Sequence, residues 1–263
     1  RVVLAAPTRH MAERWTALHP GDELSIEVVP HGFRPFDGPA APFDPPPLSG
    51  DAGEPLHLVI PGQLSSGKGR ELLEDALPRL AGRVRLTAVG CGQDGYRLFG
   101  RSGIDLVPAY DRENLPALIA ALRPHGALLL STVPETWSYT LSEMRALGLP
   151  VLASRVGSFI ERVAAGEDGL LFEPDAGALV AAIDALAASP DRLAALAGNV
   201  PDPRPLADMV ADYDRACPLP AERKTFIGGA APSTALDRDR LAARLARTAQ
   251  RADAAEQRVA AQE

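Results

Sequence analysis

Between residues 56 and 198, short apolar runs alternate with segments of helix-forming residues, and this alternation restricts the fold more than any other feature of the 263-residue chain. Runs rich in Val, Leu and Ile predict strands that are buried on both faces. We expect these strands at 57–60, 84–89, 104–107, 127–130, 151–153 and 169–172, and helices at 69–80, 96–99, 112–122, 139–147, 159–165, 176–188 and 190–196. Strands that alternate with helices predict right-handed βαβ crossovers, so the expected fold class is α/β with a doubly wound parallel sheet.

The segments on either side of this alternation divide the chain further. Residues 1–35 are predicted to form strand, helix and strand, a single βαβ unit that is too small to bury a core alone. Residues 36–55 are rich in proline and are interpreted as a linker. The main domain is expected at 56–218, with a last helix near 205–216, followed by an irregular linker at 219–234 and a long helix at 235–263.

The predicted helix at 235–263 leaves two interpretations open. Apolar or small residues recur at spacings of four and three, at Leu241, Leu245, Thr248, Ala252, Ala255 and Val259. Such a seam is typical of a coiled coil, through which the protein would form an oligomer or carry a further domain. Because only the two leucines and the valine are larger than threonine or alanine, a single solvated helix is the other interpretation.

Composition and charge disfavour several classes of protein. No apolar run approaches the ~18 residues that a membrane span needs, and no signal peptide opens the chain, which indicates a cytoplasmic location. The net charge of −7 and the pI of about 5.3 disfavour nucleic acid as a partner and limit membrane contact to a peripheral one. Cys91 and Cys217 are too few for a disulfide framework and lack metal-binding spacing. Because the chain begins at Arg1 and stops inside a predicted helix, we expect it to be part of a longer protein.

Ligands of a doubly wound sheet bind where strands end and helices begin. The loop at 61–69 lies at such a place and has the residues to hold an anion. Its glycines allow the backbone to approach closely, the following helix offers free N–H groups, and Lys68 supplies a positive charge. Gly62, Gly67 and Lys68 also lie in P-loop register. Gly69, however, stands where that motif needs a magnesium-binding hydroxyl. A phosphate-binding loop, a nucleotide hydrolase and a plain turn with a surface lysine therefore remain as alternatives.

The loop at 90–95, Gly-Cys-Gly-Gln-Asp-Gly, formally matches the dinucleotide-binding pattern G-x-G-x-x-G. The match is weak, because Asp94 would bring a carboxylate beside the pyrophosphate and the helix predicted next is short. A sharp turn whose backbone contacts a ligand and a simple tight turn are both compatible with these glycines.

The segment 131–143 follows an apolar strand and carries Glu135 before a predicted helix and Glu143 inside it. Two carboxylates along one wall of a cleft can accept hydrogen bonds from neutral hydroxyls, which sugars present in number. Paired acid/base hydrolysis needs two carboxyl groups about 5–9.5 Å apart on either side of a bond, which this spacing does not indicate. Acidic residues near the start of a helix are also favourable without any ligand.

Four patterns follow one another along the chain: Pro134-Glu135-x7-Glu143, Ala146-x-Gly148-x-Pro150-Val151, Gly157-x3-Glu161 and Gly166-Glu-Asp-Gly169-Leu-Leu-Phe-Glu-Pro174. In this order and at these intervals they resemble the C-terminal, nucleotide-sugar-binding domain of GT-B glycosyltransferases of group 1, also called family 4. The resemblance extends from about Leu56 to Leu196 and implies a Rossmann-like domain. Residues 1–35 would then be the last βαβ unit of a partial N-terminal, acceptor-binding domain.

The resemblance also implies roles for individual residues. Lys68 would pair with the donor diphosphate, Glu143 would receive the ribose hydroxyls, and Glu135 would lie by the transferred sugar at the catalytic centre. Further contacts to the donor would come from Gly62 and Gln63 in the diphosphate loop, from the backbone N–H groups of Ser138, Tyr139 and Thr140, from the base-holding residues Pro108, Ala109 and Tyr110, and from Gly90 and Gly92 in the adjoining wall. No metal and no separate cofactor is implied, because the nucleoside diphosphate sugar is itself the donor substrate.

Two positions depart from the family pattern. The family commonly has an arginine where Gln63 stands, so one of two diphosphate cations is missing. Weaker donor binding, or an amide hydrogen bond in place of the ion pair, is the expected consequence. Ser138 replaces a common glycine at the start of a helix.

The expected function is that of a bacterial hexosyltransferase for cell-surface polysaccharide. It would transfer a sugar from a nucleoside diphosphate to a hydroxyl of a saccharide or lipid-linked acceptor, with retention of anomeric configuration. The alternative is a non-catalytic, glycosyltransferase-like scaffold or binding domain of a larger multidomain protein. The incomplete acceptor domain and Gln63 favour this alternative, whereas the presence of both Glu135 and Glu143 disfavours it.

Overall fold

The computed structural model describes residues 3–20, 25–37, 46 and 55–218. Residues Arg1–Ala216 form one compact unit. The expected linker at 219–234 and the expected helix at 235–263 lie outside the described residues. Within the described ranges, no helix has the length and hydrophobicity that crossing a bilayer requires.

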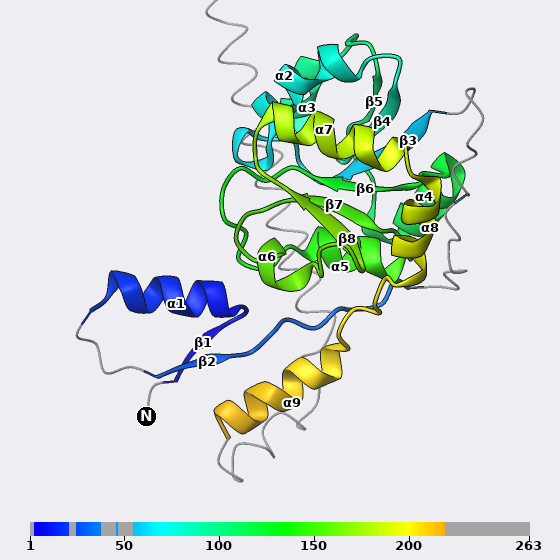
Figure 1. Cartoon of the computed structure of the whole chain (residues 1–263). Coiled ribbons are helices and arrows are strands. Elements are labelled where there is room, and N and C mark those ends of the chain that lie inside the picture. Colours follow the sequence, from blue (N-terminus) through cyan, green and yellow to red (C-terminus); the bar gives the residue numbers. More distant parts are fainter. Residues whose placement is uncertain (1–2, 21–24, 38–45, 47–54, 219–263) are drawn as a thin grey trace, which may run out of the picture. The chain divides into compact units, whose positions relative to one another are not determined.

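A parallel six-stranded sheet forms the centre of the main domain (Figure 1). Its strands are β3 (Leu56–Pro61), β4 (Val84–Val89), β5 (Ile104–Val107), β6 (Gly126–Leu129), β7 (Val151–Ser154) and β8 (Gly169–Phe172). They are hydrogen-bonded in the order β5-β4-β3-β6-β7-β8, and each neighbouring pair is parallel. This confirms the predicted doubly wound α/β fold. Because the direction of winding reverses between β3 and β6, the carboxyl ends of these two strands border the crevice in which such sheets bind ligands.

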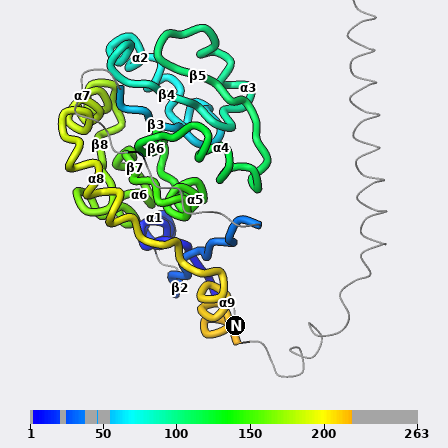
Figure 2. Tube along the Cα trace, turned by 90° about the vertical axis from the view of Figure 1, so that its right-hand side faces the viewer, coloured from blue at the N-terminus to red at the C-terminus, as the bar shows by residue number. Residues whose placement is uncertain are grey.

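Helices cover both faces of the sheet. They are α2 (Arg70–Leu80), α3 (Gly92–Gly95), α4 (Leu115–Leu122), α5 (Tyr139–Ala146), α6 (Phe159–Arg162), α7 (Ala176–Ala187) and α8 (Pro190–Gly198), with 3-10 turns η1 (Ser66–Lys68), η2 (Tyr96–Leu98) and η3 (Arg112–Asn114). The helices α2 and α7 lie side by side in both views (Figures 1 and 2). The predicted helix at 159–165 is shorter than expected, because Val163 takes an extended backbone and ends α6.

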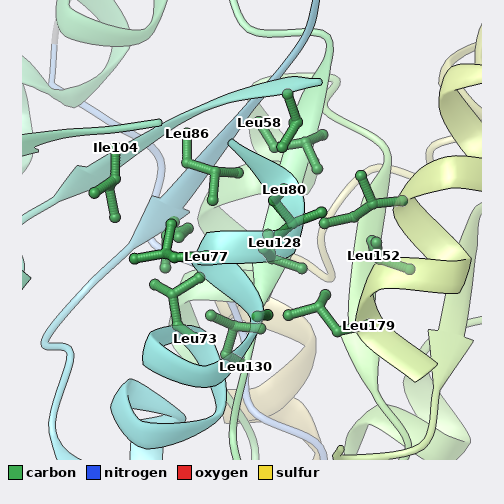
Figure 3. Packing of buried hydrophobic residues seen from close by; sticks show 14 of the residues in the cluster. Leu58, Leu73, Leu77, Leu80, Leu86, Ile104, Leu128, Leu130, Leu152 and Leu179 are labelled. Atoms are coloured by element: carbon green, nitrogen blue, oxygen red, sulfur yellow. The ribbon is translucent and has the colours of Figure 1, made fainter. Parts of the chain in front are cut away.

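Successive strand residues point to opposite faces, and this alternation builds two separate cores. In β3, Leu56, Leu58 and Ile60 pack into the cluster that includes α2 and α7. Val59, between them, packs into the cluster that includes α4 and α5. Figure 3 shows the first cluster, in which Leu58 and Leu128 of the sheet lie near leucines of α2 and α7. Burial of each such leucine stabilises the fold by roughly 1.5–3 kcal/mol.

The first segment of the chain forms the predicted strand, helix and strand: β1 (Leu4–Ala6), α1 (Arg9–Leu18) and β2 (Ile26–Val28). The two strands pair in parallel. Thr8 caps α1, because its hydroxyl accepts a hydrogen bond from the backbone N–H of Met11 at 3.3 Å. No residue of α1 is buried, which agrees with a βαβ unit that cannot enclose a core of its own.

The last described helix, α9 (Leu206–Ala216), follows a segment that contacts residues 30–33. The backbone N–H of Phe33 donates to the carbonyl of Arg204 at 2.8 Å. Gly32 lies so close to α9 that a Cβ added there would be 2.4 Å from Cα of Leu206. Only glycine therefore allows this approach. The helix expected near 205–216 thus packs against the end of the βαβ unit.

Candidate functional site

The loop after β3 is held between the carboxyl ends of β4 and β6. The N–H of Gly62 donates to the carbonyl of Val89 at 2.8 Å, and the N–H of Thr132 donates to the carbonyl of Gly67 at 3.0 Å. Gly69 has φ +85°, and a Cβ added to it would lie 2.1 Å from the carbonyl oxygen of Leu130. Position 69 therefore has no room for a serine or threonine. This loop cannot carry the magnesium-binding hydroxyl that a P-loop hydrolase needs.

Lys68 and Glu135 meet at this edge of the sheet. The Lys68 ammonium and the Ser131 hydroxyl both contact the same carboxylate oxygen of Glu135. The side chain of Lys68 is 44% exposed, whereas that of Glu135 is 12% exposed. The pair is therefore accessible from the lysine side, and an anionic ligand that binds Lys68 replaces a carboxylate that is already there.

A small cavity of about 90 Å³ surrounds this pair. Its lining includes Gly62 and the polar residues Gln63, Lys68, Ser131, Glu135 and Thr140. Five of these residues were predicted to contact the donor, and the structure brings them together. Ser131 was missed; its position directly after the apolar run at 127–130 was the available signal.

The turn between β7 and α6 determines the depth of Glu135 in the site. Gly157 has φ +51°, and a Cβ added to it would lie 2.3 Å from the backbone nitrogen of Glu135 and 2.6 Å from its carbonyl oxygen. The N–H of Ser158 donates to that carbonyl at 2.9 Å. Gly157, which predicts only a turn when taken alone, therefore allows the close approach that fixes Glu135.

The start of α5 combines a side-chain cap with an unusual backbone. Ser138 has φ +68° and ψ 92°, and its hydroxyl accepts a hydrogen bond from the N–H of Leu141 at 3.3 Å. The same hydroxyl lies 3.0 Å from the hydroxyl of Thr140. Since the first N–H groups of a helix have no partner within it, this end of α5 can bind an anion.

Tyr139, the first residue of α5, links the start of this helix to the βαβ unit. Its hydroxyl contacts Nδ1 of His31, and the His31 ring stacks on Trp137 with centroids 5.6 Å apart. Burial, and then the positive charge of Arg162, lower the pKa of His31. His31 is therefore held neutral at neutral pH, so that it serves here as a hydrogen-bonding group.

Glu143 lies on the second turn of α5. Its side chain is 13% exposed and its Oε1 lies 3.2 Å from Nε of Arg112. Burial raises the pKa of Glu143, although Arg112 opposes this effect. The carboxylate is therefore already paired, and sugar hydroxyls that bind it have to share it with Arg112 or displace that arginine.

Tyr110 forms a wall beside Glu143, as part of the loop after β5. Burial, and then the negative charge of Glu143, raise the pKa of Tyr110 to about 12. Gly90 has φ +73°, and a Cβ added there would lie 2.5 Å from Cε1 of the Tyr110 ring. The N–H of Gly92 donates to the carbonyl of Pro108 at 3.0 Å, and Ala109 is exposed. The predicted base-holding loop and the glycine turn therefore adjoin each other.

Arg112 contacts both this wall and residues 33–36, at the start of the proline-rich stretch. Its guanidinium lies 5.3 Å from the ring centroid of Phe33 and 4.6 Å from that of Phe36. A cavity of about 520 Å³ is lined by Gly32, Phe33, Arg34, Arg112, Tyr139, Glu143, Leu206 and Met209. Sequence reasoning missed Arg112, although a basic residue two positions after the predicted base-holding loop was a usable signal.

Known proteins match most of the main domain of this chain. Residues 55–189 match the family model described as glycosyl transferases group 1. A curated relative, D-inositol 3-phosphate glycosyltransferase from Arthrobacter sp. (strain FB24), is 26% identical over 183 residues, which cover 65% of this chain and 43% of the relative.

Solved structures share the fold at lower identity. Sucrose-phosphate synthase from Thermosynechococcus elongatus has a TM-score of 0.57 at 24% identity, covering 82% of this chain and 55% of that one. HepE from Anabaena, solved in complex with UDP and glucose, has a TM-score of 0.59 at 19% identity, covering 87% of this chain and 63% of that one. The chain thus spans about half to two thirds of the length of these proteins.

Proposed function

This chain belongs to the group 1 glycosyl transferases and has their GT-B, Rossmann-like fold, and from that premise we propose that it binds a nucleoside diphosphate sugar and supports transfer of the sugar to a hydroxyl acceptor. One observation carries the proposal: Lys68, Glu135 and the first turn of α5 adjoin one cavity at the carboxyl ends of β3 and β6. The match covers 43% of the curated relative, so the complete transfer reaction is part of this proposal.

In this proposal the diphosphate binds between Lys68 and the start of α5. Lys68 and the free N–H groups of α5 stabilise the negative charge that develops on the leaving diphosphate, and both are already in position before the reaction. When the donor phosphate binds Lys68, it takes the place of the Glu135 carboxylate there. The released carboxylate then accepts hydrogen bonds from the transferred sugar. Ser131 holds this carboxylate in place from the sheet side.

Glu143 and the Tyr110 wall provide the nucleoside side of the proposed site. The Glu143 carboxylate accepts the ribose hydroxyls, with Arg112 as its second partner. Gly90 and the loop from Pro108 to Tyr110 hold the base largely through backbone groups. HepE has been solved in complex with UDP and glucose and in complex with UDP-glucose, which makes UDP the first nucleotide to test here.

The finer properties are part of the same proposal. The transfer retains anomeric configuration, needs no metal and serves cell-surface polysaccharide synthesis in the cytoplasm of a bacterium, with a saccharide or lipid-linked acceptor. Through the helix that the sequence predicts at 235–263, outside the described residues, the protein is proposed to form an oligomer or to carry a further domain. Analysis of the anomer formed in the first minutes of reaction tests retention directly.

A thermal-shift panel of UDP, GDP, ADP and dTDP tests donor binding. A ligand at 100 times its dissociation constant stabilises the native protein by about 2.7 kcal/mol, so one nucleotide of the four is expected to raise the melting temperature clearly. If none of the four does so at millimolar concentration, the proposed function is wrong. A magnesium requirement for binding would instead favour the hydrolase alternative.

A second candidate, a non-catalytic binding domain, is favoured by Gln63, which leaves one diphosphate cation fewer than the family pattern has. Both candidates predict nucleotide binding, so turnover distinguishes them. Labelled nucleotide sugar incubated with the protein and candidate acceptors is expected to yield transferred sugar. Tight binding without any transfer or hydrolysis would favour the binding domain.

A further inference from the structure

Arg162, the last residue of α6, lies against the loop that begins α5. Its Nη1 donates to the carbonyl oxygen of Ser138 at 2.9 Å and also contacts that of Trp137. Its Nη2 donates to the hydroxyl of Ser142 at 2.8 Å. The guanidinium carbon lies 3.7 Å from the centroid of the Trp137 ring. One side chain therefore binds both the loop and the first turn of the helix.

The contacts of Arg162 bracket the most unusual backbone in this region. Ser138, at φ +68° and ψ 92°, occupies a conformation that residues other than glycine rarely adopt. Such a residue persists only where its surroundings hold it. The two carbonyls that Arg162 binds belong to the peptide groups on either side of the Ser138 Cα. Fixing both peptide groups fixes the φ and ψ of Ser138, and with them the direction of the N–H groups that follow.

The charge of Arg162 is not used in an ion pair. Among the described residues no carboxylate pairs with it, whereas neighbouring Arg145 pairs with Asp168 at 2.7 Å. Burial, and then the positive charge of Arg145, lower the pKa of Arg162 to about 9, so that it remains charged at neutral pH. A charged, partly buried guanidinium whose hydrogen bonds go to neutral oxygens of the loop before α5 and of its first turn is expected to hold that loop against the helix.

We propose that Arg162 is a positioning residue, which holds Ser138 in its strained conformation and thereby aims the first N–H groups of α5 at the donor diphosphate. This inference rests on the proposed function, which identifies the ligand as a nucleoside diphosphate. The assignment of Arg162 itself rests on the hydrogen bonds to the two carbonyls, the Ser142 contact and the ring contact.

The test compares Arg162→Met with the unsubstituted protein by calorimetry, using UDP and uridine as probes. Loss of hydrogen bonds from a charged donor to partly buried carbonyls is expected to weaken UDP binding on the order of tenfold or more. Uridine binding is expected to change by less than about twofold, because uridine has no phosphates. The matched control is Arg145→Met, which removes the arginine that pairs with Asp168 and contacts the backbone carbonyl of Arg162. Because Arg145 does not contact the Arg162 guanidinium or the carbonyls that it binds, this variant is expected to lower stability without weakening UDP binding.

A second substitution separates geometry from charge. Glycine adopts positive φ without strain, so Ser138→Gly in the Arg162→Met background is expected to restore most of the lost UDP affinity. If Arg162→Lys keeps the UDP affinity but Ser138→Gly does not restore it, the proposal is overturned. The charge at position 162, and not the geometry of the loop, would then determine UDP affinity. Unchanged UDP affinity in Arg162→Met would overturn it as well. Where Arg162→Met does not fold, Arg162→Gln is used with the same expectations.

Amide hydrogen exchange measured without ligand tests the role of Arg162 independently of the proposed function. The amides of residues 138–141 are expected to exchange faster in Arg162→Met and to return toward the original rate with Ser138→Gly. If the unsubstituted protein binds no nucleoside diphosphate, the proposed function fails, and these exchange rates still decide whether Arg162 holds the loop. Equal exchange rates in all variants would refute the positioning role.

Discussion

Replacement of Gly157 by alanine is expected to displace Glu135 and to slow sugar transfer by about a hundredfold. The added Cβ would lie 2.3 Å from the backbone nitrogen of Glu135 and 2.6 Å from its carbonyl oxygen, whereas ordinary contacts begin at 3.4 Å. The two backbones therefore have to separate by about 1 Å, and a displacement of that size at a reacting centre costs about two orders of magnitude in rate. Both atoms belong to backbone, which cannot rotate away as a flexible side chain can.

A matched control removes the contribution of backbone strain. Gly166 also has positive φ, at +90°, but a Cβ added to it would meet nothing within 4 Å. Alanine at either position is strained by roughly 1–2 kcal/mol, which lowers the melting temperature by a few degrees. Gly166→Ala is therefore expected to lose stability but to keep its activity within about twofold.

The assay is the rate of sugar transfer by the protein, measured well below the melting temperature of both variants. The donor is the nucleotide sugar whose diphosphate gives the largest thermal shift. Gly157→Ala is expected to be about a hundredfold slower than Gly166→Ala. Equal rates in the two variants would show that the Gly157 contact does not control Glu135.

Three further predictions concern single sites. Lys68→Ala and Glu143→Ala should each weaken nucleoside diphosphate binding about tenfold or more, since each removes a charged partner; unchanged calorimetric affinity in both would contradict the site assignment. Gly69→Ser should fail to create magnesium-dependent ATP binding and should lower the melting temperature, because its Cβ would lie 2.1 Å from the Leu130 carbonyl oxygen. Burial, and then Arg85, lower the pKa of His57 from 6.5 to about 4, so the unfolded chain takes up a proton below about pH 6.5 that the native state does not. The free energy of unfolding should therefore fall as the pH falls from about 6.5 to 4, and denaturant titrations of His57→Asn should show a flatter dependence than the unsubstituted protein.

The order of elements followed from local sequence pattern. Strands at 84–89, 104–107 and 169–172 were predicted with the bounds that the structure has, because each is a short apolar run bounded by turn residues. The convergence of Lys68 and Glu135 was also predictable, since parallel strands end at one edge of the sheet. What the pattern did not show is that the two residues pair directly, because a pair 67 residues apart in sequence is formed only by folding.

Arg112 and Arg162 mark the limit of this reasoning. Each has a charged side chain at the edge of a short helix or turn, which is where surface arginines are common. In the structure Arg112 pairs with Glu143 and lies over Phe36, and Arg162 binds the carbonyls before α5. No spacing rule links these positions, because these partners lie 20 or more residues away in the sequence, in loops and in α5.

The sequence by itself thus determined the class of fold, the edge of the sheet at which ligands bind and the loops that form that edge. The reason is that periodicity and turn chemistry act over a few residues and are read directly from the chain. Only the tertiary structure decided which charges are already paired, how closely Gly157 approaches Glu135, and what holds Ser138 in its conformation. Those properties depend on distances between segments far apart in the chain, and such distances exist only after the helices and the sheet have packed together.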